Sequence, residues 1–214
     1  MIKFLFILFI IVGCSQNDSK IDMPSFNEQR AFQHLIDQCS YGPRNPGSLG
    51  YNNFSIYLEQ YLKNLSSNII IQDFTYLEHI TGVERNGKNF IIQFNKESNE
   101  RILIGAHWDT RAISDEDTDE DNRSMPVLGA NDGASGTAVL MELATIFSIN
   151  SPPIGVDIVF FDAEDVGISG QPTTYAMGSE YFSKNLPIDK PDSGIIVDMV
   201  GDKYLKIPIE RFSY

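Results

Sequence analysis

Three apolar runs in the middle of the chain each end in a side chain that can bind a metal or a proton. The run ILIGA precedes His107, the run VDIVFF precedes Asp162, and the run GIIV precedes Asp198. Runs this continuously apolar are typical of strands in a sheet that is covered on both faces. Sites in open α/β sheets form outside the carboxyl ends of the strands, so we expect these three ends to meet.

Helical patterns lie between these runs and before them. Apolar residues recur at helical spacing in four segments, which we predict to be helices: 26–39, 52–65, 134–148 and 178–186. Ser25 is the expected N-cap of the first helix. Two further strands are expected at 69–77 and 88–94, joined by a hairpin turn at Asn86-Gly87. The alternation predicts an α/β three-layer sandwich whose central sheet is mixed and mostly parallel, with an antiparallel edge.

His107 is one of three histidines in the chain, and two acids accompany it in the sequence. Asp109 follows two residues later and is placed to accept the second imidazole N–H, which would fix the ring. Asp132 precedes the helix at 134–148, where three nearby glycines leave room for close backbone approach. Imidazole and carboxylates without a thiolate suit zinc in an open catalytic site. A helix N-terminus also favours an anion, so Asp132 as a simple cap is the alternative.

Glu164 and Asp165 follow the run VDIVFF after Asp162 and Ala163. Two adjacent side chains cannot play the same part at one site. One of them can bind the metal. The other is then free to move a proton as a general acid or base, with a pKa that the cation tunes.

Taken together, these motifs resemble those of the double-zinc aminopeptidases and glutaminyl cyclases, metallopeptidase family 28. The resemblance is carried by HWD at His107, NDGASG at Asp132, FFDAED and a strand ending in DMVG, and it runs from about residue 26 to the end. It implies a zinc aminopeptidase-like fold with one or two zinc ions. The residues carried over are given by role: Asp132 and Asp165 as zinc ligands, Glu164 as general acid/base, Asp198 as second-metal ligand or hydrogen-bonding relay, His107 as ligand if a second metal binds, and Asp109 as the carboxylate that orients His107.

Two activities fit the resemblance. The segments YGPRNPGS and GSEYF, and the long insertion between His107 and Asp132, favour a glutaminyl-peptide cyclotransferase, which converts N-terminal glutamine to pyroglutamate and releases ammonia. The first alternative is a zinc aminopeptidase that hydrolyses the N-terminal residues of peptides. The second is an inactive binding lipoprotein with a degenerate site. In the enzymatic cases the partners are the N-termini of peptides or proteins, and we expect a monomer.

Two departures from the family's pattern stand out. Asp165 replaces the more common glutamate and is one methylene shorter. The family also takes a histidine ligand from a loop well after the DMVG strand, whereas this chain has only His34 and His79 besides His107. Both lie upstream in segments that read as a helix and an edge strand. We therefore expect a catalytic domain over 26–214 that is C-terminally truncated and lacks one zinc ligand.

The N-terminus has the features of an export signal. Residues 1–13 carry Lys3 and then an apolar stretch too short for a comfortable membrane span, which predicts a signal peptide. Cys14 after a small residue resembles a bacterial lipoprotein cleavage site, with 14–25 as lipidated cysteine and polar tether. The alternative is a hydrophobic N-terminus with a chance cysteine. A lipidated protein would be exported and held at the bacterial envelope, on the outer membrane, only through its acyl chains.

The charge balance limits the possible partners. The net charge is -13 at pH 7, which argues against nucleic acid, where a basic face is expected. The acidic run 114–123 has the first spacings of a calcium-binding EF-hand. However, Glu120 stands where that loop needs glycine, and Pro126 where it needs glutamate. We interpret the run as a solvated acidic loop.

Overall fold

Residues 24–209 are described by a computed structural model, in which they form a five-stranded sheet. The strands are given in sheet order: β1 (Ile69–Glu78), β2 (Val83–Phe94), β4 (Gly155–Phe161), β3 (Arg101–His107) and β5 (Ser193–Ile196). β2 is antiparallel to both of its neighbours, whereas β3 is parallel to β4 and to β5. Four strands therefore share one direction and β2 opposes them. The predicted mixed sheet with an antiparallel edge is confirmed.

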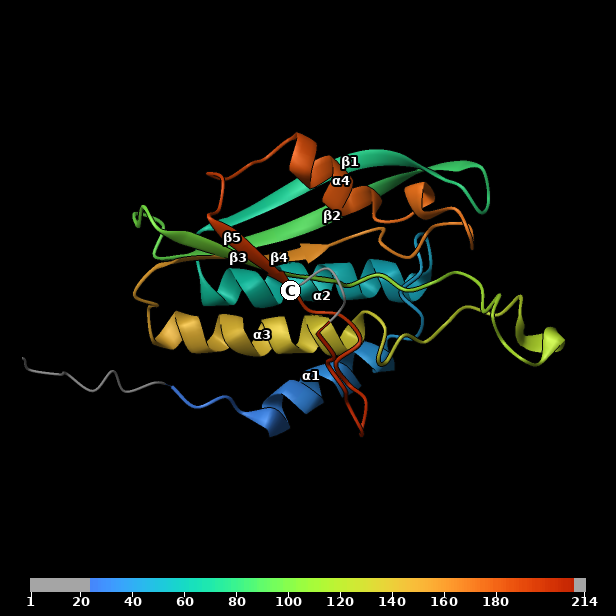
Figure 1. Cartoon of the computed structure of the whole chain (residues 1–214), viewed down its shortest axis with the longest axis horizontal. Coiled ribbons are helices and arrows are strands. Elements are labelled where there is room, and N and C mark those ends of the chain that lie inside the picture. Colours follow the sequence, from blue (N-terminus) through green and yellow to red (C-terminus); the bar gives the residue numbers. More distant parts are fainter. Residues whose placement is uncertain (1–23, 210–214) are drawn as a thin grey trace, which may run out of the picture.

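The helices cover this sheet on both faces. They are α1 (Glu28–Ser40), α2 (Leu49–Leu65), α3 (Ala134–Ile149) and α4 (Met177–Lys184). In Figure 1, α2 and α3 lie on one face with α1 beyond them, and α4 lies on the other face. Side chains of β4 alternate accordingly, because Ile158 and Phe160 join the core under α2 and α3 while Val159 and Phe161 pack with Phe182 of α4. The three-layer sandwich is confirmed.

The hairpin forms as predicted, but its turn lies elsewhere. β2 begins at Val83 and runs straight through Asn86 and Gly87, so the chain turns at residues 79–82. Gly82 supplies the positive φ of +68° that this turn needs. Gly87 faces Phe74 on β1, and a Cβ at Gly87 would lie 2.3 Å from that ring. The glycine therefore serves the packing of an aromatic ring across the strands rather than a turn.

Two element ends also differ from expectation. The N-cap of α1 is Asn27 rather than Ser25, and its side chain accepts the Arg30 N–H at 2.9 Å. The last strand, β5, was expected to be covered on both faces. Within the described residues it is not, since Ile195 and Ile196 are 57% and 63% exposed.

The predicted signal peptide, Cys14 and most of the polar tether lie outside the described residues. Within residues 24–209, no helix is both long enough and apolar enough to cross a membrane. The predictions for the N-terminus stay predictions.

Candidate metal and catalytic site

His107 is the last residue of β3 and lies at the carboxyl end of the parallel strands, where the sequence predicts the site. Its side chain is only 4% exposed, and its Nε2 lies 2.9 Å from Asp132 Oδ1 and 3.4 Å from Asp198 Oδ1. One ligand atom from each of these three residues falls within 4.8 Å of the others. Three segments far apart in the sequence thus meet at one point.

Asp132 reaches His107 because the turn before α3 is built from small residues. Gly133, with a φ of +83°, is the N-cap of α3, so Asp132 precedes the cap. The alternative in which Asp132 only caps the helix is therefore wrong. A Cβ at Gly133 would lie 2.6 Å from the Asp109 carbonyl oxygen, and one at Gly136 would lie 2.2 Å from the Val197 carbonyl oxygen. The predicted close approach of backbone at these glycines is confirmed.

The backbone just after Asp198 is bound by residues that sequence reasoning missed. The Val200 N–H donates to Ser135 Oγ at 3.0 Å, and the Gly201 N–H donates to Asn131 Oδ1 at 2.7 Å. Both acceptors flank the start of α3, next to Asp132. The only sequence signal for them is that they lie within the NDGASG motif itself.

These three residues fit a divalent cation. Both ring nitrogens of His107 are buried and lack a hydrogen-bond partner of good geometry among the described residues. Burial lowers the pKa of His107, but the carboxylates of Asp109, Asp132 and Asp198 outweigh it, so the pKa is raised well above its usual value. A site that gathers acids around a buried imidazole favours positive charge, which a zinc ion supplies.

Asp109 does more than the sequence predicts for it. Its Oδ1 lies 3.4 Å from His107 Nδ1, close enough to influence the ring. Its two carboxylate oxygens also accept the backbone N–H groups of Glu164 at 3.0 Å and Asp165 at 3.1 Å. Asp109 therefore joins the end of β3 to the acidic turn that follows β4.

Glu164 and Asp165 are partly buried beside this cluster. Burial raises the pKa of Glu164 to about 7, and burial with the charge of Asp132 raises the pKa of Asp165 to about 6. Asp165 Oδ1 accepts from Arg111 Nη1 at 3.0 Å and does not belong to the group of three around His107. Glu164 as acid/base and Asp165 as ligand both stay predictions.

Asp162, the first acid after β4, stabilises the fold and does not belong to the group around His107. It is fully buried and accepts from the Tyr51 hydroxyl and from the backbone N–H groups of Lys88 and Ala163. His34 is buried against Tyr61, and neither His34 nor His79 joins the cluster around His107. Of the three side chains that directly follow the apolar runs, only Asp162 lies outside the site, while Glu164 and Asp165 of the same turn lie beside it.

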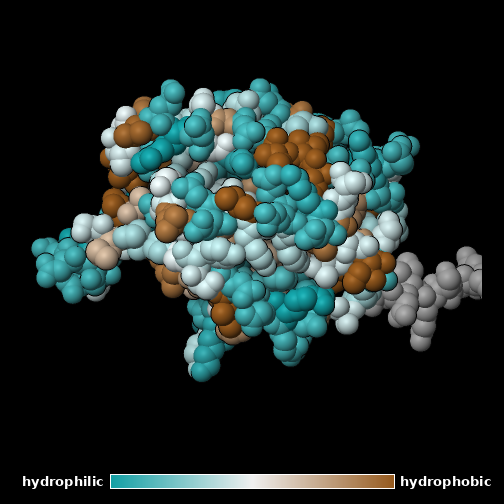
Figure 2. Space-filling view, turned by 180° about the vertical axis from the view of Figure 1, so that it is seen from behind, coloured by the Kyte–Doolittle hydropathy of each residue, from teal (hydrophilic) through white to brown (hydrophobic). Residues whose placement is uncertain are grey.

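The acidic run forms a loop that projects from the molecule, at the right of Figure 1 and as a hydrophilic knob at the left of Figure 2. Arg111 anchors its base, where its Nε and Nη2 donate to the Asp115 carboxylate. Asp115 is the first position of the EF-hand-like spacing, so the arginine occupies that carboxylate. The structure agrees with a solvated loop near the site.

A model of the family described as Peptidase family M28 matches residues 89–212, which is more than half of the chain. The chain belongs to peptidase family M28. The matched stretch of this M28 chain includes every predicted metal and catalytic residue, from His107 to Asp198. The family expected from the sequence is confirmed.

Solved structures of relatives agree with this M28 fold. The glutaminyl cyclase of Bacteroides thetaiotaomicron matches with a TM-score of 0.80 and 34% identity, over 85% of this chain and 64% of its own. The Tannerella forsythia glutaminyl cyclase has a TM-score of 0.79 and 36% identity, over 83% and 63%. A Zn-dependent exopeptidase of Parabacteroides distasonis has a TM-score of 0.79 and 34% identity, over 84% and 64%. The chain spans less than two thirds of each of these proteins.

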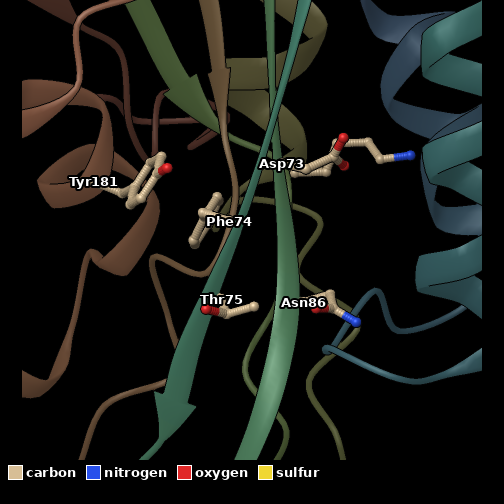
Figure 3. Close-up of a pocket in the computed structure, with 6 residues that line it drawn as sticks. Asp73, Phe74, Thr75, Asn86 and Tyr181 are labelled. Carbon is tan, nitrogen blue, oxygen red and sulfur yellow. The ribbon is translucent and has the colours of Figure 1, made fainter.

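A separate hollow of about 660 Å³ lies at the β1 side of the sheet. Figure 3 shows that Phe74 and Tyr181 lie on one side of the β1–β2 ribbon while Asp73 projects on the other. The Phe74 and Tyr181 rings stack 5.3 Å apart. None of the lining residues belongs to the candidate site.

Proposed function

We propose that this chain is a zinc-dependent glutaminyl-peptide cyclotransferase that converts N-terminal glutamine to pyroglutamate and releases ammonia. The observation that carries the proposal is the fold, which glutaminyl cyclases share at 34% and 36% identity, with a half-buried Glu164 beside the group of His107, Asp132 and Asp198. The substrates would be the N-termini of peptides or proteins. We propose that the protein acts as a monomer.

His107, Asp132 and Asp198 would hold a zinc ion, and Asp165 would contribute if Arg111 released its carboxylate. The bound ion would supply Lewis acidity that polarises the side-chain amide carbonyl of the substrate glutamine. Asp109 would keep its two hydrogen bonds to the backbone of the acidic turn, and would so keep Glu164 facing the reacting groups.

Glu164 would move the proton. The α-amine of the substrate attacks its own side-chain amide carbon, forming the ring C–N bond, and Glu164 takes a proton from the attacking nitrogen. The amide C–N bond then breaks, and Glu164 delivers the proton to the leaving nitrogen, which departs as ammonia. Burial raises the pKa of Glu164 to about 7 in the metal-free chain, and the bound cation would lower it from there. The acidic loop beside the site would attract the positively charged substrate N-terminus.

Aminopeptidase hydrolysis is the second candidate, and two observations favour it. His107, Asp132 and Asp198 would hold one cation without Asp165, so that Asp132, shared between two ions, and Asp165 would hold a second. The Zn-dependent exopeptidase matches this chain as closely as the cyclases do. In this reaction Glu164 would take a proton from the attacking water and return it to the leaving amine.

A substrate comparison on the purified full chain with zinc separates these candidates. A glutaminyl peptide and a series of aminoacyl-nitroanilides are offered to the wild type, to Glu164→Gln and to Glu180→Gln. We expect pyroglutamate formation that Glu164→Gln reduces by about a hundredfold or more, because an amide cannot carry the proton. Glu180 lies exposed on α4, so Glu180→Gln should leave the activity unchanged. Nitroaniline release without pyroglutamate would replace the cyclase with the peptidase. The absence of both, with no bound zinc, would favour the binding lipoprotein.

A further inference from the structure

Arg44 lies in the loop between α1 and α2, and its side chain is fully buried. Its guanidinium donates from Nε to the Trp108 carbonyl at 3.1 Å, from Nη1 to the Leu128 carbonyl at 3.2 Å and from Nη2 to the Gly129 carbonyl at 3.0 Å. Three carbonyl oxygens from two distant segments therefore converge on one cation. Arginine offers donors in a rigid planar fork that a lysine ammonium does not reproduce.

The backbone of Arg44 strengthens the same connection. Its N–H donates to Thr110 Oγ1 at 2.8 Å, and its carbonyl oxygen accepts the Thr110 N–H at 3.3 Å. Arg44 is thus hydrogen-bonded to Trp108 and Thr110, the two neighbours of Asp109 on the segment that follows β3. It is also hydrogen-bonded to the backbone of Leu128 and Gly129, before the turn that carries Asp132.

Burying the charge of Arg44 costs free energy. The three side-chain hydrogen bonds go to carbonyl oxygens, so none of them pairs the charge with a carboxylate. Burial lowers the pKa of Arg44 to about 10, while the charges of Cys39, Asp109 and Asp132 act in the opposite direction. The guanidinium therefore stays protonated at neutral pH. Each of the three guanidinium nitrogens donates to a carbonyl oxygen of one of two loop segments, so this buried cation acts on the relative position of those segments.

We propose that Arg44 is a positioning residue that sets the spacing between the His107–Asp109 segment and Asp132, and through it the affinity for the cation. This proposal rests on the proposed function, in which His107, Asp132 and Asp198 hold zinc. Arg44 touches neither the cation nor the substrate. Its effect reaches the site through the Trp108, Leu128 and Gly129 carbonyls.

The test compares Arg44→Lys with Arg101→Lys by calorimetric titration with Zn²⁺. Lysine keeps the charge, so Arg44→Lys isolates the geometry of the fork. Arg101 is the control at the opposite end of β3, because it is also buried, at 4% exposed, and donates to the Asn95 and Lys96 carbonyls, although it additionally pairs with the Asp157 carboxylate. We expect Arg44→Lys to weaken Zn²⁺ binding by about tenfold or more and Arg101→Lys to leave it within about twofold, although both lose stability. Equal Zn²⁺ affinity in Arg44→Lys and the wild type would overturn the proposal.

Hydrogen exchange provides a readout that needs no metal. In Arg44→Lys, the amides of residues 108–111 and 127–134 should exchange faster than in the wild type, while Arg101→Lys should leave them unchanged. If the wild type binds no Zn²⁺, the proposed function fails but the exchange still decides the role of Arg44. Unchanged exchange in these two segments would then overturn it.

If Arg44→Lys does not fold, Thr110→Val takes its place. This near-isosteric change removes the side-chain acceptor of the Arg44 N–H and keeps the guanidinium. We expect Zn²⁺ binding to weaken several-fold, with faster exchange confined to residues 108–111. Wild-type affinity in a folded Thr110→Val protein would count against the positioning role.

Discussion

The role of His107 depends on the acidic side chains around it. A buried imidazole without a good hydrogen-bond partner costs free energy, and carboxylates brought close to one another repel. Around His107 the two costs are combined, because Asp132 and Asp198 both approach the same Nε2. A cation between them relieves both. The balance of these interactions is the reason for expecting a metal here rather than a structural ion pair.

Asp132→Asn tests this balance directly. The amide keeps the size of the side chain but removes the charge that a zinc ligand supplies, so we expect Zn²⁺ affinity to fall by more than about tenfold. Titration with Zn²⁺ measures the change. Asp73→Asn, at an exposed position on β1, removes the same charge far from His107 and should bind as the wild type does. Equal losses in the two variants would mean that net charge alone governs binding.

His34 makes the stability of the fold depend on pH. Burial lowers its pKa, against the opposing charges of Glu142 and Asp37. As the pH falls through 6.5, His34 is therefore protonated in the unfolded chain while it stays neutral in the folded chain. Stability from this group is fully present above that pH and is lost as the pH falls. Between pH 8 and pH 5 the free energy of unfolding should fall more steeply than in His34→Gln, by at most about 1.4 kcal/mol per pH unit. Parallel urea-unfolding curves for the two proteins would contradict this.

At the scale of elements, the start of α3 places two of the three clustered residues. It carries Asp132 just before its cap, and its first turn meets the Val197 carbonyl at Gly136. Ser135 and Asn131 then bind the backbone just after Asp198. The approach of β5 to α3 therefore fixes how far Asp198 lies from Asp132.

Gly136→Ala should disturb that approach. Its Cβ would lie 2.2 Å from the Val197 carbonyl oxygen, so the β5 segment or α3 must shift. We expect a loss of about 1–3 kcal/mol in the free energy of unfolding, together with weaker Zn²⁺ binding. Urea unfolding and Zn²⁺ titration measure the two effects. Gly194→Ala on β5 is the control, because its nearest neighbour would be 3.8 Å away. Wild-type Zn²⁺ affinity in Gly136→Ala would show that the cluster tolerates the shift.

At the scale of the whole molecule, the N-terminal sequence predicts where the protein resides. If Cys14 carries lipid, the protein should fractionate with membranes in a bacterial host with lipoprotein processing. Cys14→Ser should then move most of it to the soluble fraction, whereas Cys39→Ser should not. Immunoblots of the two fractions measure this. A wild-type protein already in the soluble fraction would contradict the lipid anchor.

The pattern of apolar runs was sufficient to predict β3 and β4, because a strand covered by helices on both faces must be apolar on both faces. It misjudged the burial of β5, where Ile195 and Ile196 are exposed. It misplaced the hairpin turn, since Asn86-Gly87 suits a turn in isolation but Gly87 is required under the Phe74 ring. It also chose Ser25 as a cap where Asn27 lies one residue before the helix. The local sequence indicates which residue types suit a turn or a helix cap. Contacts with the rest of the fold decide which of the suitable residues occupies that position.

The sequence by itself determined the family, the order of helices and strands, and His107, Asp132 and Asp198 as members of one site. Side chains at strand ends can be read from the sequence, because each follows directly after an apolar run. Only the tertiary structure decided that Asp165 binds Arg111, that Asp162 is buried with Tyr51, and that Arg44 joins the two segments carrying the site. These are choices among partners distant along the chain. They depend on which groups packing leaves within a few ångströms, and a linear pattern does not contain that information.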